Sequence, residues 1–345
     1  MNALKRWFVP ARLDELPIGG KAIAYLLLGF WSLVVLFPLY WMAITSFKLP
    51  VDVSTGPLYI PFVDFEPHLD AWHYIFVDLG PDTYRPYMNS LIVATCGTAA
   101  SVFLGSMAAY ALARIEYRPP VAAVGSGIVL IALLIAAVAW GHVDLRIALA
   151  VALALFFLLL RPIVRRARRH LSNDDILFWV VSQRILPPVV TVIPIYLTFR
   201  DVGLLDTHLA LIITYATANL PIVVWLMFDF FDGVPREIEE SAQIDGATRF
   251  SILFGIVLPL VAPGLVATGL LVLILSWNEY LFALFLTTAN AQTMPLLVAA
   301  QNATRGPQWW NMSVLILIMI LPVMLLTLTL QRFIVRGILV GAVKG

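Results

Sequence analysis

Uninterrupted apolar runs, each long enough to cross a lipid bilayer, constrain this chain more than any other feature. The run from Val121 to Trp140 holds twenty residues without a charge, which as a helix reaches about 30 Å, the thickness of a hydrocarbon core. Only 12% of the 345 residues are charged, whereas a soluble domain has roughly 25%. The sequence therefore predicts an all-α integral membrane protein, built as a polytopic helical bundle.

Eight spans are predicted, at about residues 22–46, 86–113, 121–140, 146–160, 176–199, 209–230, 263–286 and 312–330. The first is too long for the apolar part of a signal peptide, and no small-residue cleavage site follows it, so we expect it to be retained. Most of the 22 Lys and Arg residues fall in the N-terminal segment and in the loops on the same side of the membrane. Under the positive-inside rule, this asymmetry predicts that both termini lie in the cytoplasm.

The longest polar interruption in the C-terminal half runs from Pro235 to Pro259. Pro235 suits the first position of a helix, and the glutamates after it complement the positive end of the helix dipole. Asp245-Gly246 then supplies a turn, and a second helical run ends at Pro259 after placing four apolar residues on one face, Phe250, Leu253, Phe254 and Val257. Composition alone fits an ordinary amphipathic loop, but the order of residues predicts two short helices joined by a glycine turn, forming a cytoplasmic docking knob.

This loop resembles the EAA loop of ABC importer permeases, whose pattern is E-A-A-x(3)-G-x(9)-I-x-L-P. The resemblance is carried by Glu239-Glu240-Ser241, Asp245-Gly246-Ala247 and Ile256-Val257-Leu258-Pro259. Nine residues separate Gly246 from Ile256, as the pattern requires. The first part departs from it, with Glu240 and Ser241 where two alanines are usual.

Segments along the rest of the chain are similar to the maltose-type sugar permeases. They are Phe37-Pro38-Leu39-Tyr40-Trp41, Ser46-Phe47-Lys48, Asn89-Ser90-Leu91, Ala109-Tyr110-Ala111-Leu112-Ala113-Arg114, Leu186-Pro187-Pro188, Trp277-Asn278-Glu279-Tyr280 and Gly341-Ala342-Val343-Lys344-Gly345. The resemblance implies a type-1 ABC importer transmembrane fold over residues 86–332. Residues 1–85 would be a cytoplasmic N-terminus, first span and external loop, and residues 333–345 a cytoplasmic tail.

The family usually has six spans, so the resemblance implies a six-span core with an inserted hairpin at about residues 119–175. The arginines between Arg161 and Arg169 would lie beside anionic headgroups on the cytoplasmic side. We expect a peripheral, lipid-facing hairpin; a site for an accessory subunit or a lipid is the alternative.

The resemblance also implies partners and a role for individual residues. The partners are a second permease subunit, two ATP-binding ABC subunits, an extracytoplasmic solute-binding protein that meets segments 48–85 and 287–310, and the lipid bilayer. The residues expected to couple to the ATPase subunits are Glu239, Glu240, Ser241, Asp245, Gly246, Ala247, Ile256, Pro259, Lys344 and Gly345. The location would be the bacterial cytoplasmic (inner) membrane, and the solute a carbohydrate or related polyol.

Motifs for chemistry are missing from the sequence. It has no G-x(4)-G-K-[ST] pattern, so we expect ATP and Mg on the partner ATPase subunits and no cofactor in this chain. The five histidines show no metal-ligand spacing, and the net charge of +1 gives no electrostatic support for binding nucleic acid. The chain is therefore not expected to be an enzyme or to hold a metal.

Intramembrane polar residues indicate a solute path. An acidic residue inside a span is costly and should face a wet cavity or the bundle interior. Glu279 would be a wall or gate of the path, or else a polar contact between helices. The residues expected to line the path are Tyr215, Asn219, Trp277, Asn278, Glu279 and Tyr280, with Gln183 and Arg184 as weaker candidates.

Two other functions fit parts of the sequence. A secondary transporter would need paired intramembrane acids or broken helices at a midplane site, and the sequence offers one buried acid. An intramembrane enzyme would need a catalytic constellation, which we do not find.

Overall fold

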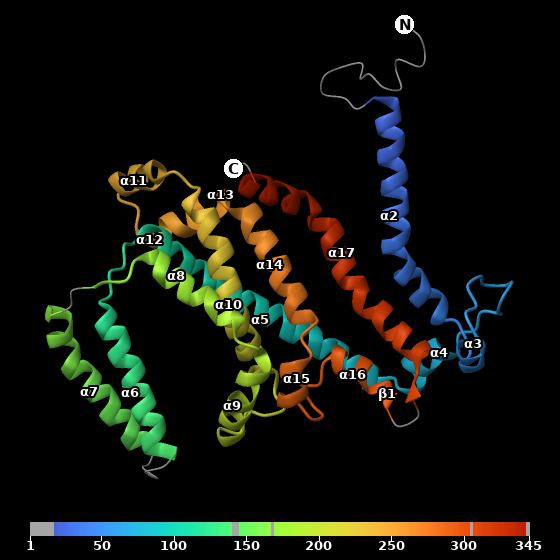
Figure 1. Cartoon of the computed structure of the whole chain (residues 1–345), viewed down its shortest axis with the longest axis horizontal. Coiled ribbons are helices and arrows are strands. Elements are labelled where there is room, and N and C mark those ends of the chain that lie inside the picture. Colours follow the sequence, from blue (N-terminus) through green and yellow to red (C-terminus); the bar gives the residue numbers. More distant parts are fainter. Residues whose placement is uncertain (1–16, 140–144, 167–168, 304–305, 343–345) are drawn as a thin grey trace, which may run out of the picture. The chain divides into compact units, whose positions relative to one another are not determined.

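The computed structural model describes residues 17–139, 145–166, 169–303 and 306–342, and they are mainly helical (Figure 1). The α-helices are α2 (Ile18–Thr45), α3 (Pro50–Thr55), α4 (Asp70–His73), α5 (Pro81–Arg114), α6 (Val121–Ala139), α7 (Leu145–Arg166), α8 (Asn173–Ser182), α9 (Pro188–Asp201), α10 (His208–Asp232), α11 (Arg236–Ile244), α12 (Arg249–Ile252), α13 (Leu258–Leu260), α14 (Ala262–Trp277), α15 (Leu281–Leu286), α16 (Met294–Ala300) and α17 (Trp309–Ala342). Shorter turns of π- or 3₁₀-helix are η1 (Tyr74–Asp78), η2 (Gln183–Ile185) and η3 (Leu253–Val257). A two-residue ladder pairs β1 (Asn302–Ala303) with β2 (Gly306–Pro307) in antiparallel register.

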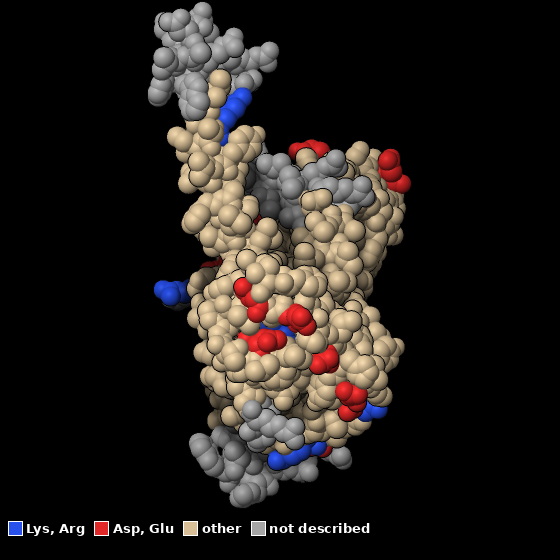
Figure 2. Space-filling model, turned by 90° about the vertical axis from the view of Figure 1, so that its right-hand side faces the viewer, with Lys and Arg blue, Asp and Glu red and all other residues tan. Residues whose placement is uncertain are grey.

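Among the described residues, helices of spanning length or bent pairs of helices correspond to six of the eight predicted spans. Four single helices in this part of the chain are long and apolar enough to cross a membrane, namely Ile18–Thr45, Pro81–Arg114, His208–Asp232 and Trp309–Gln331. Two bent helix pairs bring the number to six, which matches the six-span core. The helices α6 and α7, of 19 and 22 residues, stand where the inserted hairpin was predicted. The predicted all-α, multi-span fold is therefore confirmed, and Figure 2 shows a face on which most side chains carry no charge.

Two predicted spans are not single continuous helices. The span at residues 176–199 is broken between Asn173–Ile185 and Pro188–Asp201, whose axes differ by 89°. The cause is the Pro187-Pro188 pair, because the residue before a proline is driven out of the helical region, and Leu186 and Pro187 are extended. The span at residues 263–286 ends early, at Trp277, and α15 follows as a separate helix.

The prediction that Pro259 ends the second helix of the loop from Pro235 to Pro259 is wrong. It lies in the first turn of α13, where proline is tolerated because that N–H has no helical partner. The bend of 81° comes after it, between Arg249–Leu260 and Ala262–Trp277. The intervening Val261 has φ −93° and ψ 10°, outside the helical region.

The chain divides into two compact units. The first unit comprises Met1–Ser90 with Gln292–Leu325, and the second comprises Leu91–Ala291 with Leu326–Gly345. In the first unit, Ala71 and Ile75 pack with Met294, Val314 and Leu315 around one buried cluster. This cluster joins the segment after α2 to α16 and the start of α17.

The core of the second unit is the meeting point of α5, α10 and the segment from α12 to α14. Val223, Met227 and Phe231 of α10 pack there with Ile252 and Val257, all fully buried. Small residues let membrane helices approach closely. A Cβ added at Gly105 of α5 would lie 2.6 Å from Val223 Cγ1, so the side chain of Val223 packs directly against the backbone of α5 at that point.

The helices α6 and α7 form a hairpin whose described residues pack mainly on each other, as the two adjacent green helices of Figure 1 show. The base of the hairpin is closed by short extended strands. Val121 N donates to Arg169 O at 3.0 Å, and Leu171 N donates to Pro119 O at 2.9 Å. The predicted turn of this hairpin, residues 140–144, lies outside the described residues.

Candidate functional site

The loop from Pro235 to Pro259 folds as the sequence predicts, into two short helices joined at Gly246. The helix α11 begins at Arg236, one residue after the predicted start, with Pro235 as its N-cap. Its end is a Schellman motif, in which Ala247 N donates to Ala242 O and Gly246 N to Gln243 O, both at 3.0 Å. Gly246 has φ +84°, a conformation that glycine adopts without strain.

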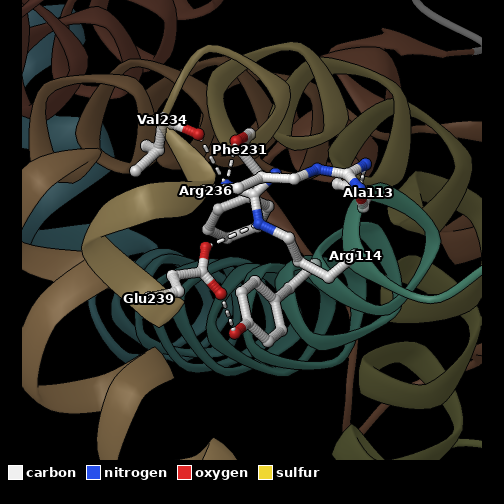
Figure 3. A network of polar contacts seen from close by, with 7 residues as sticks. Ala113, Arg114, Phe231, Val234, Arg236 and Glu239 are labelled. Carbon is white, nitrogen blue, oxygen red and sulfur yellow. Dashed lines mark hydrogen bonds and ion pairs between the residues drawn. The ribbon is translucent and has the colours of Figure 1, made fainter. Parts of the chain in front are cut away.

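A buried network, shown in Figure 3, fastens α11 to the ends of α5 and α10. Arg114 Nε donates to Glu239 Oε1 at 2.5 Å, and Tyr110 Oη donates to Glu239 Oε2 at 2.6 Å. Arg114 Nη2 donates to the carbonyls of Phe231 and Val234, at 2.8 and 2.9 Å. We call these five residues the anchor network. The Arg114 and Glu239 side chains are only 10% and 6% exposed, so solvent screens the pair weakly.

The anchor network also satisfies backbone groups that helix ends leave open. The last carbonyls of an α-helix have no partner within the helix, and a cation there complements the helix dipole. Arg114, the last residue of α5, donates to the carbonyl of Phe231 at the end of α10 and to that of Val234 just beyond it, and its charge complements the dipole of α10. The sequence marked Arg114 as the end of a span, but its partner Glu239 lies 125 positions further along the chain.

The structure corrects the assignment of Glu239. We expected its carboxylate to be offered to a partner, but the residue is 4% exposed and its oxygens face Arg114 and Tyr110. Counted back from Gly246, the glutamate of the pattern E-A-A-x(3)-G is Glu240, and Ser241 and Ala242 hold the alanine positions. The predicted register was therefore one residue early. Glu240 is exposed, whereas Ala242 packs against the core.

The remaining coupling candidates have different exposures. Ser241, Asp245, Gly246 and Pro259 are exposed, and Ala247 and Ile256 are half-buried. Lys344 and Gly345 lie outside the described residues.

The apolar face predicted for the second helix of the loop is only half right. Leu253 and Val257 are buried as expected, but Phe250 is 65% and Phe254 46% exposed. Ile252 is buried instead, directly before the π-helical turn η3, which interrupts the regular α-helical spacing on which the prediction rested.

A pocket of about 340 Å³ lies in the second unit, where the break between α8 and α9 meets α10. It brings together three residues of the predicted path, Tyr215, Asn219 and Glu279, with Gln183 and Arg184. The other three candidates do not line it. Trp277 is buried elsewhere, at 4% exposure, while Asn278 and Tyr280 are exposed. Sequence reasoning missed Thr214 and Thr217 of α10, which also line the pocket.

Polar contacts fix several of the lining residues. Asn219 Nδ2 donates to Ser276 Oγ at 3.1 Å, and Arg184 Nη1 donates to Ala218 O at 3.3 Å. Glu279 Oε1 accepts from Phe282 N at 3.1 Å, so one oxygen of this side chain caps α15. Glu279 therefore lines the pocket, and its side-chain contact to Phe282 N is a local one at the start of α15. Whether it forms a wall or gate of a solute path, or a polar contact between helices, stays a prediction.

The comparisons with known proteins agree with this architecture. Residues 101–340 match the family described as binding-protein-dependent transport system inner membrane component. The chain is 30% identical over 318 residues to the probable ABC transporter permease protein y4oR of Sinorhizobium fredii, covering 91% of this chain and 94% of that protein. It is 29% identical over 320 residues to the trehalose/maltose transport system permease protein MalG of Thermococcus litoralis, covering 91% and 93%.

A solved structure shares the fold. It is a chain of a bacterial ABC transporter involved in the import of the acidic polysaccharide alginate, with a TM-score of 0.61 and 20% sequence identity, covering 94% of this chain and 99% of that chain. The fold is therefore that of a type-1 ABC importer permease. The family match extends over most of the chain, from the middle of α5 through the anchor network and the pocket to α17, and this chain belongs to the family of binding-protein-dependent transport system inner membrane components.

Proposed function

We propose that this chain is the transmembrane permease subunit of an ATP-driven ABC importer, and that ATPase subunits act on it through the loop from Pro235 to Pro259. The observation that carries the proposal is the two-sided character of α11. Its inner side is fastened by Glu239 to Arg114, whereas its outer side presents Glu240 to solvent. A helix of this kind can receive a force on one side and pass it on from the other.

The outer side of the loop has the composition of a docking surface. Glu240 and Asp245 offer exposed carboxylates, and next to them Ile244 and Phe250 are 87% and 65% exposed. Apolar side chains this exposed on a cytoplasmic loop are costly in water and gain free energy when a partner covers them. A groove on an ATPase subunit, with basic groups and an apolar floor, would satisfy both kinds of side chain.

The anchor network supplies the route by which such a force would reach the membrane. Tilting α11 would either move Arg114 and the end of α10 with it or leave buried charges without partners, at a cost of several kcal/mol. A movement imposed on the loop would therefore be passed to α10 as a whole. This helix of 25 residues carries Tyr215 and Asn219, which line the pocket.

The pocket would be part of the solute path, completed by a second permease subunit. Arg184, Asn219 and Glu279 can exchange hydrogen bonds with hydroxyl groups, as a carbohydrate or related polyol requires. Relatives of this chain are named for the transport of trehalose and maltose, sulfoquinovosyl glycerol and diacetylchitobiose. These names support a sugar or a sugar derivative as the solute.

External segments 48–85 and 287–310 would receive an extracytoplasmic solute-binding protein. The first of them bears five exposed carboxylates, Asp64, Glu66, Asp70, Asp78 and Asp82. On the side of the molecule that Figure 2 shows, acidic side chains outnumber basic ones.

ATP and Mg would bind to the ATPase subunits. The chain would lie in the inner membrane with both termini in the cytoplasm.

Co-purification tests the proposal. The tagged chain, extracted in detergent, should bring down an ATPase subunit and a second permease. Glu240→Lys and Gly246→Pro should lose the ATPase and keep the second permease. Glu116→Lys is the matched control, because Glu116 is also exposed at the cytoplasmic end of α5 but lies outside the loop. A chain that purifies alone, or variants that keep the ATPase, would contradict the proposal and favour secondary transport.

A further inference from the structure

Asp206, in the turn between α9 and α10, makes the densest set of hydrogen bonds to one side chain among the described residues. Its carboxylate accepts from the backbone N–H groups of Thr288, Ala289, Asn290 and Ala291, and from the Thr288 hydroxyl and the Asn290 amide, at 2.9 to 3.2 Å. In return, Asp206 N donates to Leu286 O at 2.8 Å. We call this set of contacts the external clasp.

The backbone conformation at Asp206 and the donors around its side chain both bear on why an aspartate occupies this position. Asp206 has φ +58°, in the left-handed region where glycine is at ease and other residues are strained. Consecutive backbone N–H groups form a concave site for an anion, and residues 288–291 form such a site around this carboxylate. Partial burial by itself raises the pKa of Asp206, but the N–H groups of Asn290, Ala291, Thr288 and Ala289 outweigh it and hold the pKa well below its usual range.

The external clasp lies where the chain passes from one compact unit to the other. The chain makes three such passages, at residues 90–91, 291–292 and 325–326. The first and third lie inside α5 and α17, shortly after the interior prolines Pro86 and Pro322 of these helices. The second lies in the segment from Thr287 to Thr293, which is neither helix nor strand. The clasp fastens one side of this irregular passage to the start of α10.

The other side of the same passage is also held, within the first unit. Asn89 Nδ2 donates to Gln292 O at 2.8 Å, and Met294 N donates to Ser90 Oγ at 2.8 Å. Residues 288–291 are therefore fixed to the start of α10, and residues 292–294 to α5. The two sets of contacts therefore meet at the peptide link from Ala291 to Gln292.

We propose that Asp206 is a positioning residue for transport, which fixes the root of external segment 287–310 to α10. The inference rests on the proposed function, in which α10 is moved from the cytoplasmic side. The clasp makes the outer end of α10 and the root of the external segment one rigid body. A displacement of α10 then also displaces the surface that receives the binding protein. Conversely, a displacement of this surface when the binding protein docks is passed to α10.

Distance measurements between spin labels test this inference in the complete importer reconstituted in lipid. Cys96 is replaced by serine, and labels are placed on cysteines at the exposed Val202, in the second unit, and the exposed Asn302, in the first. With Asp206 intact, we expect one narrow distance distribution, which shifts when ATP, Mg²⁺ and vanadate are added. Asp206→Gly, which removes the carboxylate and also relieves the left-handed strain, should at least double the width and abolish the shift. Asp206→Asn, which keeps one acceptor oxygen, should lie between.

The control and the ATPase activity separate this inference from the proposed function. Asp201→Gly removes a neighbouring exposed carboxylate, paired with Arg200 at 2.9 Å, and should leave the distribution narrow. The ATPase activity of the Asp206→Gly importer without binding protein should stay within about twofold of the parent, because docking at the cytoplasmic loop is untouched. An unchanged width in Asp206→Gly, or no shift in the parent, would overturn the role of Asp206. Loss of the ATPase subunits from the parent complex would overturn the proposed function instead.

Discussion

The loop from Pro235 to Pro259 and the hairpin of α6 and α7 both interrupt the six-span core, yet they are attached to it in opposite ways. The loop is fastened by the buried pair of Arg114 and Glu239 and by Ile252 and Val257, both fully buried. The described residues of the hairpin pack mainly on each other, and its base is closed by a short ladder at residues 119–121 and 169–171. Under the proposed function, we therefore expect a force on the loop to be passed to the core, and a force on the hairpin to displace mainly the hairpin itself.

Breaking the anchor network should have the largest effect. Arg114→Met leaves Glu239 buried without a cation, and removing one partner of a buried ion pair costs about 3–5 kcal/mol. We expect the purified complex to unfold at lower temperature and solute uptake to be lost. Thermal unfolding followed by intrinsic fluorescence, with uptake into proteoliposomes, measures the two effects.

A double variant separates stability from coupling. Arg114→Met with Glu239→Leu removes both charges, and replacing a buried pair by apolar residues is often neutral for stability. We expect the unfolding temperature to recover while uptake stays below one-tenth of the parent, because the polar link from α11 to α10 is gone. Recovery of uptake together with stability would show that the network only holds the fold and transmits nothing.

The sequence predicted the spans well and the anchor network poorly, for a physical reason. The thickness of the bilayer sets the length of an apolar run, so each span is visible from its own residues. Glu239 and Glu240 are both acidic and adjacent, and nothing local tells which of them faces inward. The choice is made by Arg114, 125 positions away. Placing the pattern E-A-A-x(3)-G from Gly246 backwards would have found the outward residue.

Core packing gives the next largest contrast. Leu253 is 5% exposed, and cutting a buried leucine to alanine costs about 2–5 kcal/mol. Leu158 of α7 is 73% exposed, and the same change should cost almost nothing. We expect Leu253→Ala to lower the unfolding temperature of the complex by several degrees and Leu158→Ala to leave it unchanged. Equal shifts for the two variants would mean that the hairpin is packed as tightly as the loop.

The glycine turn gives a smaller effect. Gly246 has φ +84°, and a residue with a side chain in this region costs about 1–2 kcal/mol. The turn sets the angle between α11 and α12, which together form the proposed docking surface. Gly246→Ala should therefore weaken the binding of the ATPase subunit about tenfold. Gly255→Ala is the matched control, because an added Cβ there meets nothing within 4 Å and its φ is ordinary. Similar affinities for the two variants, measured by titration of the purified ATPase, would remove Gly246 from the coupling surface.

The prolines explain why the sequence predicts the approximate position of each bent region but not the bend itself. Proline is compatible with the first turn of a helix and incompatible with its interior. The sequence predicts that Pro259 ends a helix, but Pro259 lies inside the first turn of α13. The sequence also places Pro187 and Pro188 within one span, but the helices on the two sides of this pair differ in direction by 89°. A proline in the sequence indicates that a helix begins or ends nearby. The tertiary contacts decide on which side of the proline the helix lies.

Removing the hairpin should have the smallest effect. Replacing residues 121–168 by a short glycine–serine link keeps the extended strands at Pro119 and Leu171, whose hydrogen bond already brings the two ends together. The deletion leaves Asn173 in place, which donates from Nδ2 to the carbonyls of Leu112 and Ile115 and so joins α8 to the end of α5. We expect the shortened chain to assemble with its partners and to retain at least half of the uptake in proteoliposomes. Loss of assembly would mean that the hairpin binds an accessory subunit, and loss of uptake at normal assembly would mean that it carries a force as the loop does.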